Sequence, residues 1–246
     1  MKYEFQMGIS MTTEGKNTQV DESNDLATSF ARGHSGRADK TRQDIIDAAG
    51  SLFAEKGFKA TTISQICKAA DVNQAAVNFH FGGKEQLYID LVRYGYEYAL
   101  AEIPRPKWEP GTPATGRLSD FIVTFLRRAV ADREPHWPRQ LIMREMIEPT
   151  KACEEFVRGY IRPSLALLQS ILQDLLPADF PQERRLLVGQ SIIGQMLFYR
   201  VARPVLKLVL AGNDLLRFDE PQIQRLADHI TAFTLAAMGA APALNV

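Results

Sequence analysis

The stretch 62–83 carries the start and stop signals of two short helices separated by a turn of three residues. Thr62 and Gln65 have the spacing of a capping box, in which two side chains satisfy free amides at the start of a helix. Asn73 is a favourable N-cap for a second helix over 74–81, and Gly82 follows its end. Two short helices joined by a turn at 71–73 predict a helix-turn-helix arrangement.

Longer helices are expected on both sides of this pair. A helix over about 40–56 would be ended by Gly57, and its apolar residues recur on one face at Ile45, Ala49, Leu52 and Phe53. Lys84 opens a further helix, which carries an apolar stripe made of Leu87, Leu91 and Tyr94.

The second short helix has an outward polar face. Val77 is expected to point inward, which leaves Gln74, Ala75 and Asn78 outward. Gln and Asn can pair bidentately with adenine in the major groove of DNA, and a small Ala leaves room for a thymine methyl. Alternatively, Gln74 and Asn78 are solvated residues of a surface helix.

Four segments together resemble the opening of TetR-family transcriptional regulators. They are TRQDIIDAA at 41–49, LFAEKGF at 52–58, ATTI at 60–63 and VNFHFGGKEQLY at 77–88. The resemblance implies that Thr62, His80 and Lys84 contact DNA phosphates, and that Gln74, Ala75 and Asn78 face bases.

Two of these positions have alternatives, and one neighbouring position departs from the family. His80 can instead be a packed core histidine, and Lys84 an exposed residue that helps to cap its helix. The family often has Tyr where this chain has Phe79, which lacks a hydroxyl for a phosphate.

Positive charge near this region is modest. Residues 37–94 hold eight Lys or Arg against seven acids, which predicts weak non-specific affinity and a moderate salt dependence. Four basic residues precede or open the first helix: Arg32, Arg37, Lys40 and Arg42. They form either an arm that reaches the DNA backbone or minor groove, or a solvated tail.

The chain divides into three expected parts. Residues 1–36 are polar and are interpreted as a disordered leader, with Met7 or Met11 as alternative starts. Residues 37–103 form the helix-turn-helix domain with its connecting helix, and a proline-rich break at 104–116 opens a helical domain over 104–246. No segment alternates with period two for long, so an all-α fold is predicted.

The second domain is expected to bind a ligand and to dimerise. Residues 186–210 are apolar nearly all round, as in a helix buried on more than one side. In the TetR family the last two long helices form a four-helix dimer interface, a role that the resemblance assigns to about 184–203 and 222–238. Alternatively, both helices close the core of a single chain.

Two further segments, MREMIEPT at 143–150 and GQMLFYRVARP at 194–204, look like those of the CecR-like subgroup. That likeness implies an effector that is small and partly aromatic, antibiotics included, and control of transport genes. Soft or aromatic side chains suited to an apolar pocket, or alternatively to plain core packing, are Trp137, Met143, Met146, Phe156, Tyr160, Met196 and Tyr199. Arg144 and Glu145 are expected in structural ion pairs, and Arg200 and Arg203 in surface salt bridges or on a ligand anion.

Other functions find little support in the composition. The two cysteines and four histidines lack metal-ligand spacing, so no metal or cofactor is expected. The Gly82-Gly83-Lys84 run lacks the rest of a phosphate-binding loop, and no nucleophile–base pair suggests an enzyme. Because two cysteines cannot form a disulfide framework, a reducing, cytoplasmic location is expected. Neither a signal peptide nor a membrane span is recognised.

The sequence therefore predicts a homodimeric, ligand-responsive repressor that binds a palindromic double-stranded DNA operator. An activator, and a constitutive DNA-binding protein without a ligand, are the alternatives.

Overall fold

The computed structural model describes residues 36–130, 136–209 and 218–239, and these contain helices and no strand. The expected leader over 1–36 falls almost wholly outside the described residues, as do Arg32 and the side chain of Arg37. The all-α prediction is confirmed.

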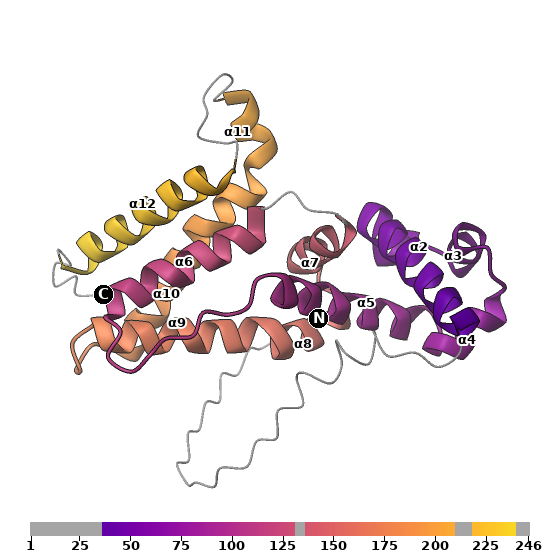
Figure 1. Cartoon of the computed structure of the whole chain (residues 1–246), viewed down its shortest axis with the longest axis horizontal. Helices are drawn as coiled ribbons and strands as arrows, with labels where there is room; N and C mark the ends of the chain where they lie inside the picture. The colour runs from indigo at the N-terminus through magenta and orange to yellow at the C-terminus, as the bar shows by residue number, and fades with distance from the viewer. Residues whose placement is uncertain (1–35, 131–135, 210–217, 240–246) are drawn as a thin grey trace, which may run out of the picture. The chain divides into compact units, whose positions relative to one another are not determined.

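Four helices form the first group (Figure 1): α2 (Gly36–Ala60), α3 (Ile63–Ala70), α4 (Gln74–Phe81) and α5 (Lys84–Glu102). Gly57 interrupts α2 with φ 82° and ψ 169°, a backbone conformation that side-chain-bearing residues rarely adopt. The regular part of α2 therefore ends where the sequence predicts, and residues 58–60 turn the chain toward α3.

The second group begins with α6 (Ala114–Val130) and α7 (Trp137–Ile147). It continues through α8 (Ala152–Phe156), a π-helical turn η1 (Val157–Ile161) and α9 (Arg162–Leu175). The last helices are α10 (Gln182–Val201), α11 (Arg203–Val209) and α12 (Glu220–Gly239). The helix expected over about 184–203 corresponds to α10, and the apolar stretch 186–210 does not continue as one helix, because the chain breaks at Ala202 before α11 begins.

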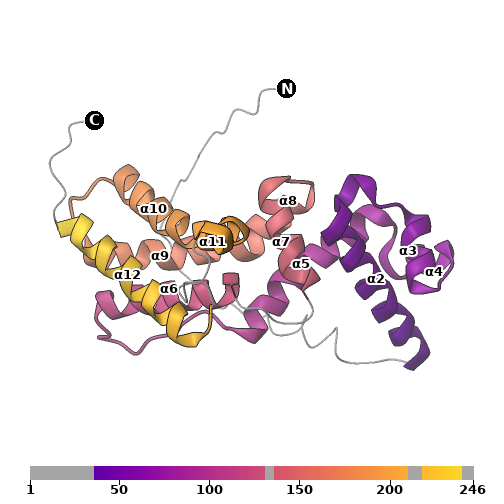
Figure 2. The ribbon, with the colours of Figure 1, turned by 90° about the horizontal axis from the view of Figure 1, so that it is seen from above.

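One core joins α6, α9, α10 and α12, which lie together in both ribbon views (Figures 1 and 2). Its fully buried side chains include Leu118, Ile122, Leu126, Leu168 and Met196. The helices α5 and α7 pack against one another, and α7 also contacts α2. Because α5 also contacts α8 and the π-helical turn, α5 and α7 together join the first group of helices to the second.

Glycines permit two of these close contacts. A Cβ on Gly50 of α2 would lie 2.5 Å from the ring of Trp137, and one on Gly95 of α5 would lie 3.1 Å from the carbonyl oxygen of Pro138. Trp137 is buried and stacks on Tyr94, with ring centroids 5.4 Å apart.

Candidate nucleic-acid interface and interior cavity

The short helix α4 is held by caps at both ends and by one buried face. The Asn73 side chain accepts a hydrogen bond from the amide of Ala76 at 2.9 Å, and Gly82 closes the helix in the left-handed conformation. Val77 and Phe81 form the buried face of this helix. Its bounds, Gln74–Phe81, are those that the sequence predicts, and the three-residue turn before it is confirmed.

The opposite face of α4 is open. Gln74, Ala75 and Asn78 are exposed, as expected. Phe79 is 83% exposed, and its ring lies edge-on to that of the adjacent His80, with centroids 5.1 Å apart. An amide-bearing face with a large apolar side chain at its edge suits the major groove, where it can meet base edges and thymine methyl groups.

Cations at the far end of α4 are held by aromatic rings. The Arg42 guanidinium lies 5.1 Å from the centre of the Phe81 ring, and the Lys84 ammonium lies 4.5 Å from that of Phe58. Burial lowers the pKa of both side chains. These cation–π contacts hold each charged group against an aromatic ring beside α4.

The helix α3 is set in place by its capping box and by a buried threonine. The Thr62 amide donates to Gln65 Oε1 at 2.9 Å, and the Gln65 amide donates to Thr62 Oγ1 at 3.2 Å, which confirms the predicted pair. Thr61 is fully buried, and its hydroxyl donates to the carbonyl oxygen of Gly57 at 2.9 Å. The turn that leads from α2 to α3 is therefore held by hydrogen bonds to buried groups.

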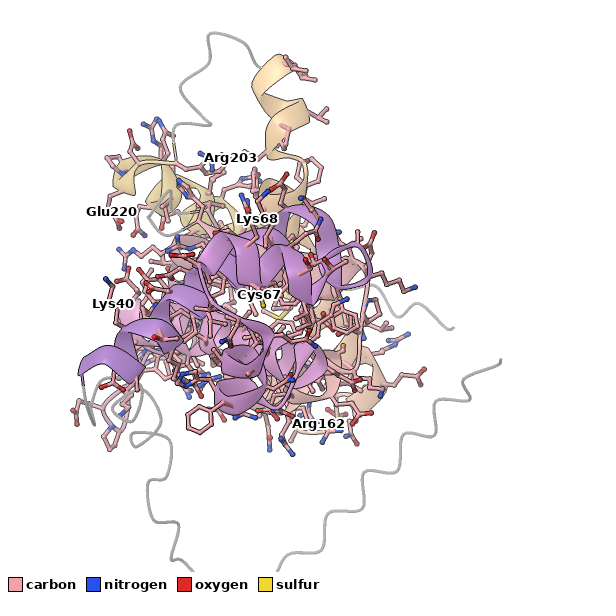
Figure 3. All side chains as sticks on the ribbon, turned by 90° about the vertical axis from the view of Figure 1, so that its right-hand side faces the viewer. Lys40, Cys67, Lys68, Arg162, Arg203 and Glu220 are labelled. Atoms are coloured by element: carbon pink, nitrogen blue, oxygen red, sulfur yellow. The ribbon has the colours of Figure 1, made fainter. Side chains whose placement is uncertain are left out.

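Figure 3 looks onto α2, α3 and α4 and labels Lys40 and Lys68, both exposed.

Arg144 of α7 binds the end of α2. Its Nη2 donates to the carbonyl oxygen of Glu55 at 2.9 Å and its Nε to that of Ala54 at 3.3 Å. Carbonyls in the last turn of a helix carry partial negative charge, which a guanidinium stabilises. Arg144 also pairs with Glu148 at 3.2 Å, as the expectation of an ion pair requires.

Glu145 departs from that expectation. Its carboxylate is fully buried and accepts hydrogen bonds from neutral groups, namely the Tyr88 hydroxyl at 2.8 Å and the Thr150 amide at 2.6 Å. Burial and this carboxylate raise the pKa of Tyr88. These hydrogen bonds connect α5 to α7. The Tyr88 ring also packs against the rings of Phe53 and Phe58, with centroids 5.0 Å away in each case.

A cavity lies among α5, α6, α7, the π-helical turn and α10. It encloses about 560 Å³ of empty space, its open mouth included. Its walls are mainly apolar and aromatic, with three arginines, and consist of Gly95, Tyr96, Ala99, Phe125, Arg128, Ala129, Arg139, Ile142, Met143, Met146, Phe156, Tyr160, Leu197 and Arg200. An apolar and aromatic lining with a few polar groups is typical of sites for small organic molecules.

The π-helical turn shapes one wall. Pro163 has no amide to offer the Gly159 carbonyl one turn earlier. Arg105 Nη2 instead approaches the carbonyl oxygens of Gly159 and Tyr160, each at 3.4 Å. This turn presents Phe156 and Tyr160 as stacked rings, 5.5 Å apart and 11° from parallel.

Two family models match the chain. Residues 45–91 match the family described as bacterial regulatory proteins of the tetR family, and residues 114–238, half of the chain, match the C-terminal domain of the HTH-type transcriptional dual regulator CecR. The chain belongs to the TetR family. It is a CecR-like, DNA-binding regulator of transcription.

Known TetR-family proteins are similar over most of the chain. The HTH-type transcriptional regulator AcrR of Shigella flexneri is 25% identical over 68% of this chain and 81% of its own length. CecR of Shigella flexneri is 23% identical over 79% of this chain and 90% of its own length. The fold also matches a crystal structure of a tetR-family regulatory protein from Rhodococcus RHA1, with a TM-score of 0.57, 18% identity and coverage of 82% and 98%.

Of the residues singled out for DNA in this TetR-family chain, five lie on α4, Thr62 caps α3 and Lys84 begins α5. Arg42 lies on α2, with its guanidinium beside the Phe81 ring of α4. Of the residues singled out for a ligand, Met143, Met146, Phe156 and Tyr160 line the cavity. The other three do not: Trp137 is packed on Gly50, and Met196 and Tyr199 belong to the core or pack against it.

Sequence reasoning missed Tyr96 and Arg128 as cavity residues. Tyr96 comes from the connecting helix α5, whose polar and aromatic residues give no periodic signal for a pocket. Arg128 is basic and sits in a pair of arginines, a pattern that usually marks a solvated helix end. Among the described residues no group of acids, histidines and cysteines can hold a metal ion, and no described helix is long and apolar enough to cross a membrane.

Proposed function

We propose that this TetR-family regulator is a homodimeric repressor that binds a palindromic operator and releases it when a small molecule occupies the cavity. The observation that carries the proposal is the position of the cavity between α5 and α7. One of these helices continues directly from the end of α4 and the other holds the end of α2 through Arg144.

The contacts of α4 support direct reading of bases. In this proposal Gln74, Ala75, Asn78 and Phe79 enter the major groove, while Arg42, Thr62, His80 and Lys84 contact phosphates. Phosphate contacts set the position on the duplex, and base contacts set the sequence that is bound. The DNA-binding domain would comprise residues 37–103 and the ligand-binding and dimerisation domain residues 104–246, with 1–36 as a leader.

Dimerisation is supported by apolar side chains that a single chain leaves uncovered. Phe198 and Val201 of α10 are 53% and 58% exposed, and Phe233 of α12 is 58% exposed. Such exposure along two neighbouring helices is typical of a protein–protein interface. A second copy packed there would place two α4 helices for successive major grooves, about 34–36 Å apart.

The dimer can be tested with Phe198→Glu and Phe233→Glu together. Because both side chains are exposed in the single chain, the variant should stay folded but sediment as a monomer. Gln173→Glu, an exposed site on α9, adds the same kind of charge and should remain dimeric. A dimeric double variant would contradict this interface.

Release would follow from a shift between two dimer conformations. A ligand moves such an equilibrium only by its differential affinity for the two states, and a coupling of about 1–3 kcal/mol corresponds to roughly 5–150-fold weaker operator binding. Tyr96 and Ala99 of α5 and Met143 of α7 line the cavity, so a ligand there would act on both helices at once.

The decisive experiment maps DNA upstream of the protein's own and neighbouring genes by footprinting. The proposal expects two symmetric protected half-sites, and loss of protection with a compound that binds the purified protein. Operator affinity unchanged by every compound that binds would refute ligand release. The name of CecR, a dual regulator, favours testing activation too, and a reporter behind the operator distinguishes repression from activation.

A further inference from the structure

Arg128 of α6 is a buried cation at the cavity wall. It is only 8% exposed, and its Nε donates to the carbonyl oxygen of Ile103, the residue that ends α5, at 2.6 Å. Its Nη2 is buried and has no hydrogen-bond partner among the described residues. A buried, incompletely satisfied charge costs several kcal/mol in the absence of a compensating partner.

A second guanidinium lies nearby. Arg105 lines a smaller hollow of about 240 Å³ together with Phe125 and Arg128, which also line the main cavity. The Arg105 Nε is likewise buried without a partner. Burial, and secondarily the charge of Arg128, lower the pKa of Arg105. The two cations therefore share one region of positive potential.

The charged side chains of the cavity wall are basic. Arg128, Arg139 and Arg200 line it, whereas Glu155, which accepts a hydrogen bond from the Tyr96 hydroxyl at 3.0 Å, is not one of the wall residues. The remaining walls are aromatic and thioether groups: the stacked rings of Phe156 and Tyr160 face a lining that includes Tyr96, Phe125 and two methionines. Positive potential in an apolar chamber favours a ligand with a flat apolar body and one negative group.

We propose that the effector is a small aromatic carboxylate whose carboxylate binds the free edge of Arg128 and whose ring packs against Phe156 and Tyr160. This rests on the proposed function, because it names the chemical class that acts at the same cavity.

The same guanidinium would connect the ligand to the DNA-binding helices. Through Nε, Arg128 holds the carbonyl that terminates α5, and α5 begins directly after α4. A carboxylate that reorients the guanidinium would therefore change how the end of α5 is held.

The test compares three probes of one shape on the full-length protein: 2-naphthoate, the neutral 2-naphthamide and the cationic 2-naphthylmethylamine. Calorimetry should show the carboxylate binding about tenfold or more tightly than the amide, with the amine weaker still. Arg128→Gln should remove the difference between carboxylate and amide, and Arg128→Lys should retain part of it. Arg162→Gln, at an exposed site of α9, should change neither (Figure 3).

The outcomes separate this inference from the function. If the amide or the amine binds as tightly as the carboxylate, or if none of the three binds, the inference is overturned. If the carboxylate binds through Arg128 but operator affinity does not change, the site is correct and ligand release is refuted. The comparison among probes on the unaltered protein holds even if an Arg128 variant fails to fold.

Discussion

Replacing Arg144 with Met removes the bonds by which α7 holds the end of α2, while an unbranched apolar stem is retained. Nη2 reaches the Glu55 carbonyl at 2.9 Å and Nε reaches that of Ala54 at 3.3 Å. A bond from a charged donor contributes about 1.5–3 kcal/mol when buried. Since the side chain is 28% exposed, we assign about 1.5 kcal/mol to the shorter bond and roughly half of that to the longer.

The ion pair with Glu148 adds little, because that partner is 70% exposed and surface pairs contribute about 0–1 kcal/mol. The free energy of unfolding should therefore fall by about 2 kcal/mol. With a denaturant slope of about 2 kcal/mol per molar, the urea midpoint should fall by about 1 M. Circular dichroism measures this at a fixed protein concentration, since dimerisation would otherwise shift the midpoint.

Arg158→Met is the matched control. Arg158 also pairs with a carboxylate, Glu155, but its side chain is 74% exposed, so the free energy of unfolding should change by no more than about 0.5 kcal/mol, as is typical of surface substitutions. Equal midpoints for the two variants would refute the role assigned to the bonds between α7 and α2.

Three further predictions concern pH, packing and the exposed face. The pKa of Tyr88 is raised in the folded state, so the stabilisation from its phenol proton is complete below about pH 10 and is lost as the pH rises above it. The free energy of unfolding of the parent should therefore fall more steeply above pH 10 than that of Tyr88→Phe. Equal dependence of the two free energies on pH would contradict this. A Cβ on Gly159 would lie 2.4 Å from the Tyr96 hydroxyl, so Gly159→Ala should lower the free energy of unfolding by about 1–3 kcal/mol in urea titrations, whereas Gly116→Ala, which meets nothing within 4 Å, should not. Phe79→Ala should weaken operator binding in an anisotropy assay at an unchanged melting temperature, because the ring is 83% exposed; a lower melting temperature would show that the ring supports the fold.

The sequence predicts the helix-turn-helix closely because its signals are local. The Thr62–Gln65 capping box, the Asn73 cap and the left-handed Gly82 each act within four residues, and all three form as expected. Backbone geometry over such short distances depends little on the rest of the fold.

The cavity could be predicted only in part, because residue type does not decide which side of a helix faces a void. Met143 and Met196 are chemically alike, yet one lines the cavity and the other is fully buried in the core of the second group of helices. Arg128 escaped notice because its burial depends on the end of α5, which is distant in sequence. The fully buried Glu145 is similar, since its partner Tyr88 lies 57 residues away.

The apolar segment 186–210 illustrates a third limit. The sequence pattern shows that this segment is apolar on all sides. It does not distinguish residues that face the core from residues that one chain leaves exposed to solvent. Ile192 is buried, whereas Leu187 is 55% exposed on the same helix. Whether such an exposed apolar residue is covered depends on a partner protein. The pattern of apolar residues in one chain does not specify that partner.

Operator binding by the Gln74→Ala, Asn78→Ala double variant tests the central claim most directly. Both side chains are exposed on α4, so the variant should melt with the parent. Each bidentate contact to a base contributes about 1–3 kcal/mol of discrimination, so specific affinity should fall at least about thirtyfold while binding to unrelated DNA stays the same. A variant that binds its operator as tightly and as selectively as the parent would contradict the assignment of α4 as the helix that reads DNA.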